Sequence, residues 1–267
     1  MDLGLAGARA VVQGGSRGMG RAAAECLAAD GAAVAVLARS AADLDATVDA
    51  LRRVGSPDAV AIATDLTDGA AVARAFAALD ARWGELNVLV NAAGPTGRGI
   101  GAFEALTDED WHAAFDMATL SMVRSVRAAL PLLRKAAWAR IVNVAAHSTK
   151  RQSVGLAAYT AGKAAMTSAS KNLSLALAPE GILVNTVSPG SFTSPALRGW
   201  VAGLGGYDPD DLRDVMRAVA DRFGHPAQLG RAAEPREIGP VIAFLASRAN
   251  TYMTGANVNV DGGSDWS

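Results

Sequence analysis

The sequence has little cysteine and no excess of either charge, and each shortage excludes a class of protein. Cys26 is the only cysteine among 267 residues, so no internal disulfide forms and a disulfide-stapled secreted scaffold is excluded. The 25 basic and 26 acidic residues give a formal net charge of -1, which provides no field for holding a phosphate backbone. We therefore expect a cytoplasmic protein without a nucleic-acid partner.

The chain also lacks long hydrophobic runs and clustered metal ligands. Its first ten residues contain Asp2 and no basic segment followed by an apolar core, so no secretory signal is predicted. The charge-free stretch 181–197 contains two prolines and several hydroxyl side chains, and no membrane span is predicted there. The histidines, His112, His147 and His225, do not have metal-ligand spacing. We expect no metal site and no membrane association.

What is present is a regular alternation of short apolar runs and longer helical stretches. The apolar runs are continuous, which is typical of parallel strands covered on both faces. Strands are predicted at Ala10–Gln13, Ala33–Ala38, Ala59–Ala63, Leu86–Val90, Ile141–Ala145, Ile182–Val187 and Asn257–Val260. Helices are predicted at Gly20–Ala29, Ala41–Val54, Ala70–Arg82, Glu109–Lys135, Ala157–Leu177 and Pro235–Ser247. This alternation predicts a single α/β domain over residues 1–267 with a doubly wound parallel sheet of about seven strands.

Residues 191–229 interrupt this pattern. The stretch holds several glycines, Pro209 and a predicted short charged helix, Asp210–Arg222. A long excursion after the carboxyl end of a strand is where a lid over a ligand would lie, so we predict a substrate lid; a surface loop without function is the alternative. Its apolar side chains either line a pocket or pack the lid together, and they are Phe192, Leu197, Trp200 and Met216.

The turn after the first predicted strand is rich in glycine. Gly14, Gly18 and Gly20 stand where a tight turn, a close approach to pyrophosphate and close helix–strand packing each require a missing side chain. The helix that follows points its unpaired N–H groups towards an anion. An ordinary strand–helix turn is the alternative, but the position after the first strand of a βα series favours a nucleotide site.

The end of the second predicted strand indicates which nucleotide binds. Arg39 follows this strand, and no acidic residue occurs before Asp43 on the next helix. An acidic residue at the strand end would bind a ribose hydroxyl of NAD, whereas guanidinium groups suit the 2′-phosphate of NADP. Arg39, with Arg17 in the glycine turn, therefore predicts NADP(H); two solvated surface arginines are the alternative.

Tyr159 and Lys163 are four residues apart and share one face of a predicted helix. A free phenol has a pKa of about 10. A nearby ammonium favours the phenolate and lowers that pKa, which would allow the tyrosine to exchange a proton with a substrate oxygen. An ordinary surface pair is the alternative, and the nucleotide-binding α/β context favours the catalytic interpretation.

These motifs, with several others, resemble the short-chain dehydrogenase/reductase family over residues 5–263. The matching positions are Gly14, Gly18 and Gly20, Asp65, the run Asn91–Gly94, Tyr159 with Lys163, Asn185, Pro189–Gly190 and the tail Thr254–Gly263. The resemblance implies a Rossmann-type sheet of seven parallel strands and hydride transfer between a nicotinamide and a carbonyl/alcohol pair. It also implies a homotetramer or dimer packed through the helices Glu109–Lys135 and Ala157–Leu177.

The resemblance implies a role for each residue of the site. Tyr159 is the implied general acid/base, and Lys163 binds the nicotinamide ribose and tunes the tyrosine. Asp65 is expected beside the adenine, and Pro189–Gly190 beside the nicotinamide. The implied cofactor contacts are Gly14, Ser16, Arg17, Gly18, Met19, Gly20, Arg39, Asp65, Leu66, Asn91, Ala92, Gly94, Tyr159, Lys163, Pro189, Gly190 and Ser194.

Two positions depart from the family pattern in ways that bear on catalysis. The family places a serine thirteen residues before the tyrosine, and this position is Ala146. Ser148 is the nearest hydroxyl, and we assign it provisionally as the donor to the developing oxyanion, with Thr149 and Ser153 as weaker candidates. The family's helix asparagine, which supports a water-linked proton path to the lysine, corresponds to Ala118. Thr119 or backbone carbonyls substitute for it, or proton relay is slower.

Two milder departures are Gln13, where the family usually has threonine, and Ser194, which supplies the hydroxyl after the Pro-Gly pair.

We interpret the chain as an NADP(H)-dependent oxidoreductase acting on a ketone or secondary alcohol, and 3-oxoacyl-type substrates are favoured. The alternative is a nucleotide-binding protein with weak or no turnover that serves as a sensor or assembly partner. The retained Tyr159 and Lys163 favour the enzyme. Arg98 either meets an acidic substrate or is exposed to solvent.

Overall fold

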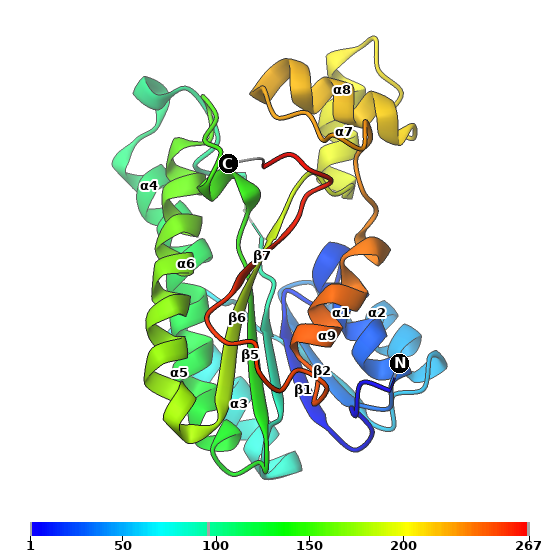
Figure 1. Cartoon of the computed structure of the whole chain (residues 1–267), viewed down its shortest axis with the longest axis vertical. Helices are drawn as coiled ribbons and strands as arrows, with labels where there is room; N and C mark the ends of the chain where they lie inside the picture. Colours follow the sequence, from blue (N-terminus) through cyan, green and yellow to red (C-terminus); the bar gives the residue numbers. More distant parts are fainter. Residues whose placement is uncertain (1, 95–96, 266–267) are drawn as a thin grey trace.

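A parallel seven-stranded sheet lies between two layers of helices in the computed structural model, which describes residues 2–94 and 97–265 (Figure 1). The strands are β1 Arg9–Gln13, β2 Ala33–Ala38, β3 Ala59–Ala63, β4 Val88–Asn91, β5 Ala139–Val144, β6 Ile182–Pro189 and β7 Asn257–Val260. Their order in the sheet is β3-β2-β1-β4-β5-β6-β7. The predicted single-domain, doubly wound Rossmann-type fold is therefore confirmed, and three strands have the predicted bounds.

Two hydrophobic cores, one on each face of the sheet, explain why the strands are apolar throughout. Successive residues of β2, Val36 and Leu37, are fully buried in different cores. One core is shared with α1 Gly18–Ala29, α2 Ala41–Arg53 and α9 Gly239–Leu245. The other is shared with α3 Gly69–Trp83, α5 Ser121–Leu133 and α6 Ala157–Leu177. A strand that packs on both faces has no polar side to display.

The predicted helix Glu109–Lys135 is wrong as a single element. The structure has α4 Asp108–Phe115, a π-helical turn Asp116–Leu120 and then α5. The Ser121 N–H donates to the Asp116 carbonyl, five residues back, and the Ser121 hydroxyl donates to the Met117 carbonyl at 2.6 Å. This wide turn brings Ala118 against α6, where a methyl group on Gly162 would lie 3.1 Å from the Ala118 Cβ.

The predicted helices near the carboxyl end also differ from the structure. Pro235–Ser247 divides into a 3₁₀ turn, Pro235–Glu237, and α9. The charged helix of the 191–229 segment is α8 Leu212–Phe223, and a further helix, α7 Pro195–Leu204, was not predicted. Ser194 caps α7 by accepting the Leu197 N–H at 3.1 Å, and Pro195 begins the helix, which is a recognisable start signal.

Residues 191–229 form a small unit beyond the carboxyl ends of β6 and β7 (Figure 1). Helices α7 and α8 pack on each other through Val201, Val215, Met216, Ala218 and Val219. Leu197 and Trp200 are partly buried against this cluster, so they pack the unit together. Phe192 belongs to the core shared with α1. The role of this segment as a substrate lid stays a prediction.

Candidate active site

The predicted site residues gather at the carboxyl edge of the sheet. Strand β1 is hydrogen-bonded to β2 on one side and to β4 on the other, so the chain leaves β1 and β4 in opposite directions across the sheet. Such a switch point leaves a crevice where open α/β sheets bind ligands. The glycine turn follows β1, Asn91–Gly94 follows β4, and Tyr159 and Lys163 stand at the start of α6 after β5.

The glycine turn is packed too closely to accept a side chain at Gly14 or Gly20, whereas Gly18 has open space beside it and a φ of 56°. A methyl group on Gly20 would lie 2.3 Å from the Gly14 carbonyl oxygen, and one on Gly14 would lie 2.8 Å from the Ala93 Cα. Gly14 also has a φ of 72°, which disfavours other residues. At the start of α1, no side chain caps the first N–H groups. This compact turn with uncapped donors fits a pyrophosphate.

The remaining predicted contacts of this turn lie beside it. Ser16 is buried, and its carbonyl accepts the Thr47 hydroxyl at 3.0 Å. Met19 packs against the core shared with α1. Arg17 is exposed and forms an ion pair with Asp43. Arg17 therefore pairs with the first acidic residue of α2.

Charged side chains after β2 and β3 mark the expected adenosine end. Arg39 is exposed after β2, and Asp65 is exposed after β3, followed by the buried Leu66. The Asp65 carboxylate accepts the Thr67 N–H at 2.9 Å and the Thr67 hydroxyl at 2.7 Å. These hydrogen bonds, with a smaller contribution from the Arg39 charge, hold the pKa of Asp65 below its usual range.

The segment after β4 joins this edge to the centre of the site. Asn91 is buried, and its amide donates to the Asn143 side chain at 2.7 Å. The Ala92 N–H donates to the Gln13 carbonyl at 2.9 Å, which ties this segment to the end of β1. Gly94 is exposed and lines the cavity that contains the tyrosine and lysine.

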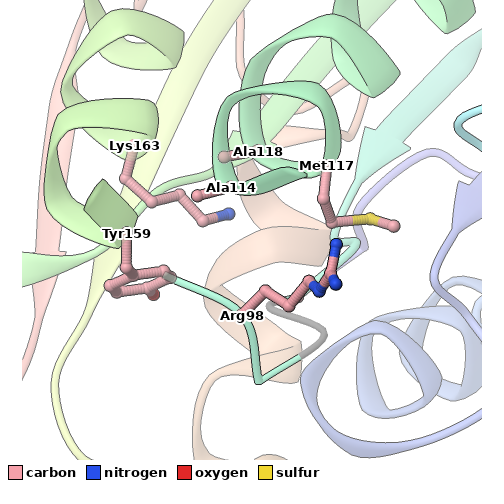
Figure 2. A pocket seen from close by; sticks show the side chains of 7 residues that line it. Arg98, Ala114, Met117, Ala118, Tyr159 and Lys163 are labelled. Carbon is pink, nitrogen blue, oxygen red and sulfur yellow. The ribbon is translucent and has the colours of Figure 1, made fainter. Parts of the chain in front are cut away.

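Tyr159 and Lys163 line one small cavity, one helical turn apart on α6 (Figure 2). The other lining residues are Gly94, Arg98, Ala114, Met117 and Ala118. The buried Lys163 ammonium donates to the Val144 carbonyl at 2.7 Å and more weakly to the Ala93 carbonyl at 3.4 Å. The lysine is therefore anchored to the ends of β4 and β5, in the same cavity as the phenol.

The direction of the tyrosine pKa differs from the sequence-based expectation. Burial raises the pKa of Tyr159 to about 12 and lowers the pKa of Lys163 to about 8. Both shifts follow from removal of the charged form from water, and the Lys163 ammonium is directed to backbone carbonyls. Tyr159 is therefore a protonated phenol at neutral pH, which suits a proton donor.

The candidate hydroxyls near Ala146, the alanine that replaces the family serine, differ in their hydrogen bonds. Ala146 is buried in extended backbone at the end of β5, and Ser148 is buried in the following turn. The Thr149 hydroxyl donates to the Ala146 carbonyl at 2.9 Å, and the Ser153 hydroxyl donates to the Phe223 carbonyl at 2.7 Å. Ser148 instead accepts the Thr160 hydroxyl at 3.2 Å, so its own hydrogen is left for another acceptor.

Ala118 lines the cavity that holds Lys163. The Thr119 hydroxyl donates to the Gly162 carbonyl at 2.7 Å and is buried between the helices. Thr119 is thus committed to joining the π-helical turn to α6. Backbone carbonyls in place of the missing asparagine, or a slower proton relay, stay as predictions.

The end of β6 closes the site on the expected nicotinamide side. A methyl group on Gly190 would lie 2.7 Å from the Asp261 Cα, so only glycine fits there. The Pro189 carbonyl lies 3.1 Å from the Nδ1 of His147. His147 is buried, and its other ring nitrogen faces His225 from the 191–229 segment at 3.3 Å. No sequence pattern predicts this pairing.

Arg98 lies at the rim of the cavity, where its side chain both lines the cavity and is exposed to solvent. Its side chain reaches over the site next to Met117 (Figure 2). Its Nε lies 3.8 Å from the Asp110 carboxylate, and the side chain is largely exposed. Sequence reasoning did not identify Ala114 and Met117 as lining residues, because apolar residues on a helix carry no signal that separates a cavity wall from a core.

Among the helices in residues 2–94 and 97–265, none is both long and apolar enough to cross a bilayer. In the same described residues, no group of three or more histidine, cysteine, aspartate or glutamate side chains is arranged to hold a metal ion.

The sequence is similar to that of known oxidoreductases. A family model described as enoyl-(acyl carrier protein) reductase matches residues 14–265. The chain is 37% identical over 260 residues to the putative ketoacyl reductase of the monensin polyketide synthase from Streptomyces virginiae, with 95% of each chain covered.

Solved structures are similar over nearly the whole chain. L-sorbose reductase from Gluconobacter frateurii, in complex with NADPH and L-sorbose, has a TM-score of 0.92 at 27% identity, with 100% of both chains covered. An NADPH-bound short-chain oxidoreductase from Pseudomonas aeruginosa, described as containing an atypical catalytic center, has a TM-score of 0.87 at 31% identity, with 97% of both chains covered.

Proposed function

Because this chain belongs to the short-chain dehydrogenase/reductase family, we propose that it is an oxidoreductase that uses NADP(H) to reduce a ketone to a secondary alcohol, or to run the reverse reaction. The observation that carries this proposal is the placement of Tyr159 and Lys163 in one cavity beside the switch point of the sheet. A protein that only binds a nucleotide has no need for a proton-exchanging phenol at that position.

The proposed chemistry assigns one task to each side chain. The nicotinamide, when bound, supplies or accepts the hydride at the carbonyl carbon. The Tyr159 hydroxyl donates its proton to the carbonyl oxygen during reduction, and burial keeps that hydroxyl protonated until it reacts. The Lys163 ammonium stabilises the phenolate that remains and holds the ribose. The Ser148 hydroxyl donates to the same developing oxyanion.

The activity is tested by following NADPH oxidation with a panel of simple ketones and 3-oxoacyl thioesters. The similarity to a ketoacyl reductase supports the inclusion of 3-oxoacyl substrates. Turnover with members of the panel supports the oxidoreductase. Binding of NADPH without any turnover favours the alternative, a nucleotide-binding sensor or assembly partner.

The choice of NADP(H) over NAD(H) rests on Arg39. We expect Arg39→Ala to weaken NADPH binding by about 10–100-fold, because a charge-assisted hydrogen bond to the 2′-phosphate is lost. NADH binding is expected to stay within a few-fold, since NADH has no such phosphate. Fluorescence titration of both cofactors measures the difference. Arg53→Ala, which removes an exposed arginine from the far end of α2, is the matched control. An equal loss for both cofactors would contradict the assignment.

The role of Ser148 is tested by removing its hydroxyl. We expect Ser148→Ala to lower kcat by about 10–100-fold, because one hydrogen bond to a developing negative charge is lost. The dissociation constant for NADPH should not change. Ser153→Ala is the control, since that hydroxyl donates to the Phe223 carbonyl. If kcat is unchanged in Ser148→Ala, the oxyanion donor is another group.

We further propose that residues 191–229 act as a substrate lid and that the chain forms a homotetramer or dimer in the cytoplasm. Exposed apolar side chains on the outer helices support assembly, and they are Phe115, Leu120 and Leu175. The position of α7 and α8 beyond the carboxyl edge of the sheet supports the lid (Figure 1).

A further inference from the structure

Two histidines far apart in the sequence meet between the catalytic turn and the 191–229 segment. His147 lies in the turn after β5, and His225 follows the Gly224 that ends α8. Both side chains are buried, with exposed fractions of 8% and 3%. The His147 Nε2 lies 3.3 Å from the His225 Nδ1, and the ring planes are inclined by 74°. The residues are 78 positions apart, so sequence spacing gives no sign of the pair.

The outer nitrogen of each ring is held by a backbone carbonyl. The His147 Nδ1 lies 3.1 Å from the Pro189 carbonyl, and the His225 Nε2 lies 2.9 Å from the Gln152 carbonyl. A carbonyl only accepts, so a neutral ring that bonds its carbonyl carries its hydrogen on the outer nitrogen. A neutral imidazole has one N–H, and therefore both inner nitrogens present lone pairs. In that pair of tautomers the inner nitrogens, 3.3 Å apart, have no hydrogen between them; a hydrogen on either inner nitrogen would instead join the rings directly.

This arrangement matches half of a metal centre. Metal-binding histidines almost always donate the second ring N–H to a carbonyl or carboxylate, as both rings do here. Two nitrogens at about 2.0–2.1 Å from a tetrahedral zinc ion lie about 3.3–3.4 Å apart, and the observed separation is 3.3 Å. We propose that His147 and His225 chelate a divalent transition-metal ion of the zinc, nickel or copper class, with water in the remaining positions.

Charges of both signs surround the histidine pair. The carboxylates of Asp261 and Asp265 lie near enough to His147 to act on its pKa, and both favour positive charge there. Lys150 opposes them, since its Nζ lies 3.5 Å from the Asp265 carboxylate, and Arg151 donates to the Gly224 carbonyl at 3.1 Å.

The ion would bridge the turn that carries Ser148 to the end of the proposed lid. The same two segments are already joined by the Ser153 hydroxyl, which donates to the Phe223 carbonyl at 2.7 Å. A metal ion at this junction adds a bond between them without touching Tyr159 or Lys163. Binding of the ion is thus measurable apart from the oxidoreductase activity.

The test is titration of the full chain with Zn²⁺ and, separately, with Cu²⁺. We expect saturable binding, with nitrogen hyperfine structure from imidazole in the electron paramagnetic resonance spectrum of the Cu²⁺ form. At about 100 times the dissociation constant, Zn²⁺ should raise Tm by about 5–10 °C. Mg²⁺ should not raise Tm, because it prefers oxygen ligands.

Variants decide whether these two rings are the ligands. His225→Gln and His147→Asn should each weaken Zn²⁺ binding by at least about tenfold, since a two-ligand chelate becomes a single ligand. His112→Gln, which changes the exposed third histidine, should bind Zn²⁺ as the parent does. Melting curves without metal show whether each variant folds. One folded variant of the two is enough to test whether the histidines are the ligands. Absence of saturable binding in the parent, or equal binding in all variants, overturns the metal site while leaving the oxidoreductase proposal intact.

Discussion

Replacement of Tyr159 by phenylalanine is expected to lower kcat by about 10²–10⁴-fold, the usual contribution of a positioned general acid or base. The variant loses one oxygen atom and keeps the aromatic ring that lines the cavity. Its fold should therefore match the parent, and its affinity for NADPH should change far less than kcat, since Tyr159 is one of many implied cofactor contacts. Burial raises the pKa of Tyr159 to about 12, so the parent carries the donor proton at neutral pH and phenylalanine has none to give.

The measurement is steady-state NADPH oxidation with the most active ketone of the panel, together with a fluorescence titration of NADPH. Tyr252→Phe is the matched control, because its side chain is 97% exposed and remote from α6 in the sequence. A Tyr159→Phe variant that turns over as fast as the parent would remove the general acid/base from the mechanism. A variant that loses NADPH binding as well would point to a structural role for the phenol.

Replacement of Gly20 by alanine is expected to weaken NADPH binding by about 10²–10⁴-fold, through loss of about two charge-assisted hydrogen bonds from the phosphate-binding turn. The added methyl group would lie 2.3 Å from the Gly14 carbonyl oxygen, and this contact is with backbone. The turn must therefore move. Overpacking of this kind also costs about 1–3 kcal/mol of stability.

Gly203→Ala is the control for this substitution. Gly203 lies in α7, and a methyl group there would meet nothing within 4 Å. Alanine has the higher helix propensity, so we expect unchanged NADPH binding and equal or greater stability. Isothermal titration with NADPH and thermal melting compare both variants with the parent. Unchanged NADPH affinity in Gly20→Ala would place the phosphates elsewhere.

Local patterns predicted most of the fold, because continuous apolar runs report burial on both faces of a strand. β2, β3 and β7 begin and end where their sequence patterns do. The helix over 109–135 was mispredicted since its interruption depends on a partner. Thr119 and Ala118 meet α6 there, and the helix widens to fit that contact. Helix α7 was not predicted because Gly199 and Gly203 have low helix propensity. The helix packs on α8 through Val201.

The candidate site shows the same division. The glycine turn and the Tyr159–Lys163 spacing are recognisable because each lies within one short segment. The commitments of Thr149 and Ser153 to backbone carbonyls are visible only in the structure, and they leave Ser148 as the hydroxyl with a hydrogen to donate. Sequence reasoning named all three and had no means of ranking them by hydrogen bonding.

The amino-acid order by itself determined the alternating α/β domain, the phosphate-binding turn and the helical face that pairs a phenol with an amine, since each depends on residues within a few positions of one another. Tertiary structure alone decided the rest. Burial reversed the expected pKa direction of Tyr159, because desolvation depends on what the fold packs around a group. The fold brings the turn after β5 against the 191–229 segment, and this places His147 against His225. No local pattern encodes this contact, because the two residues are 78 positions apart.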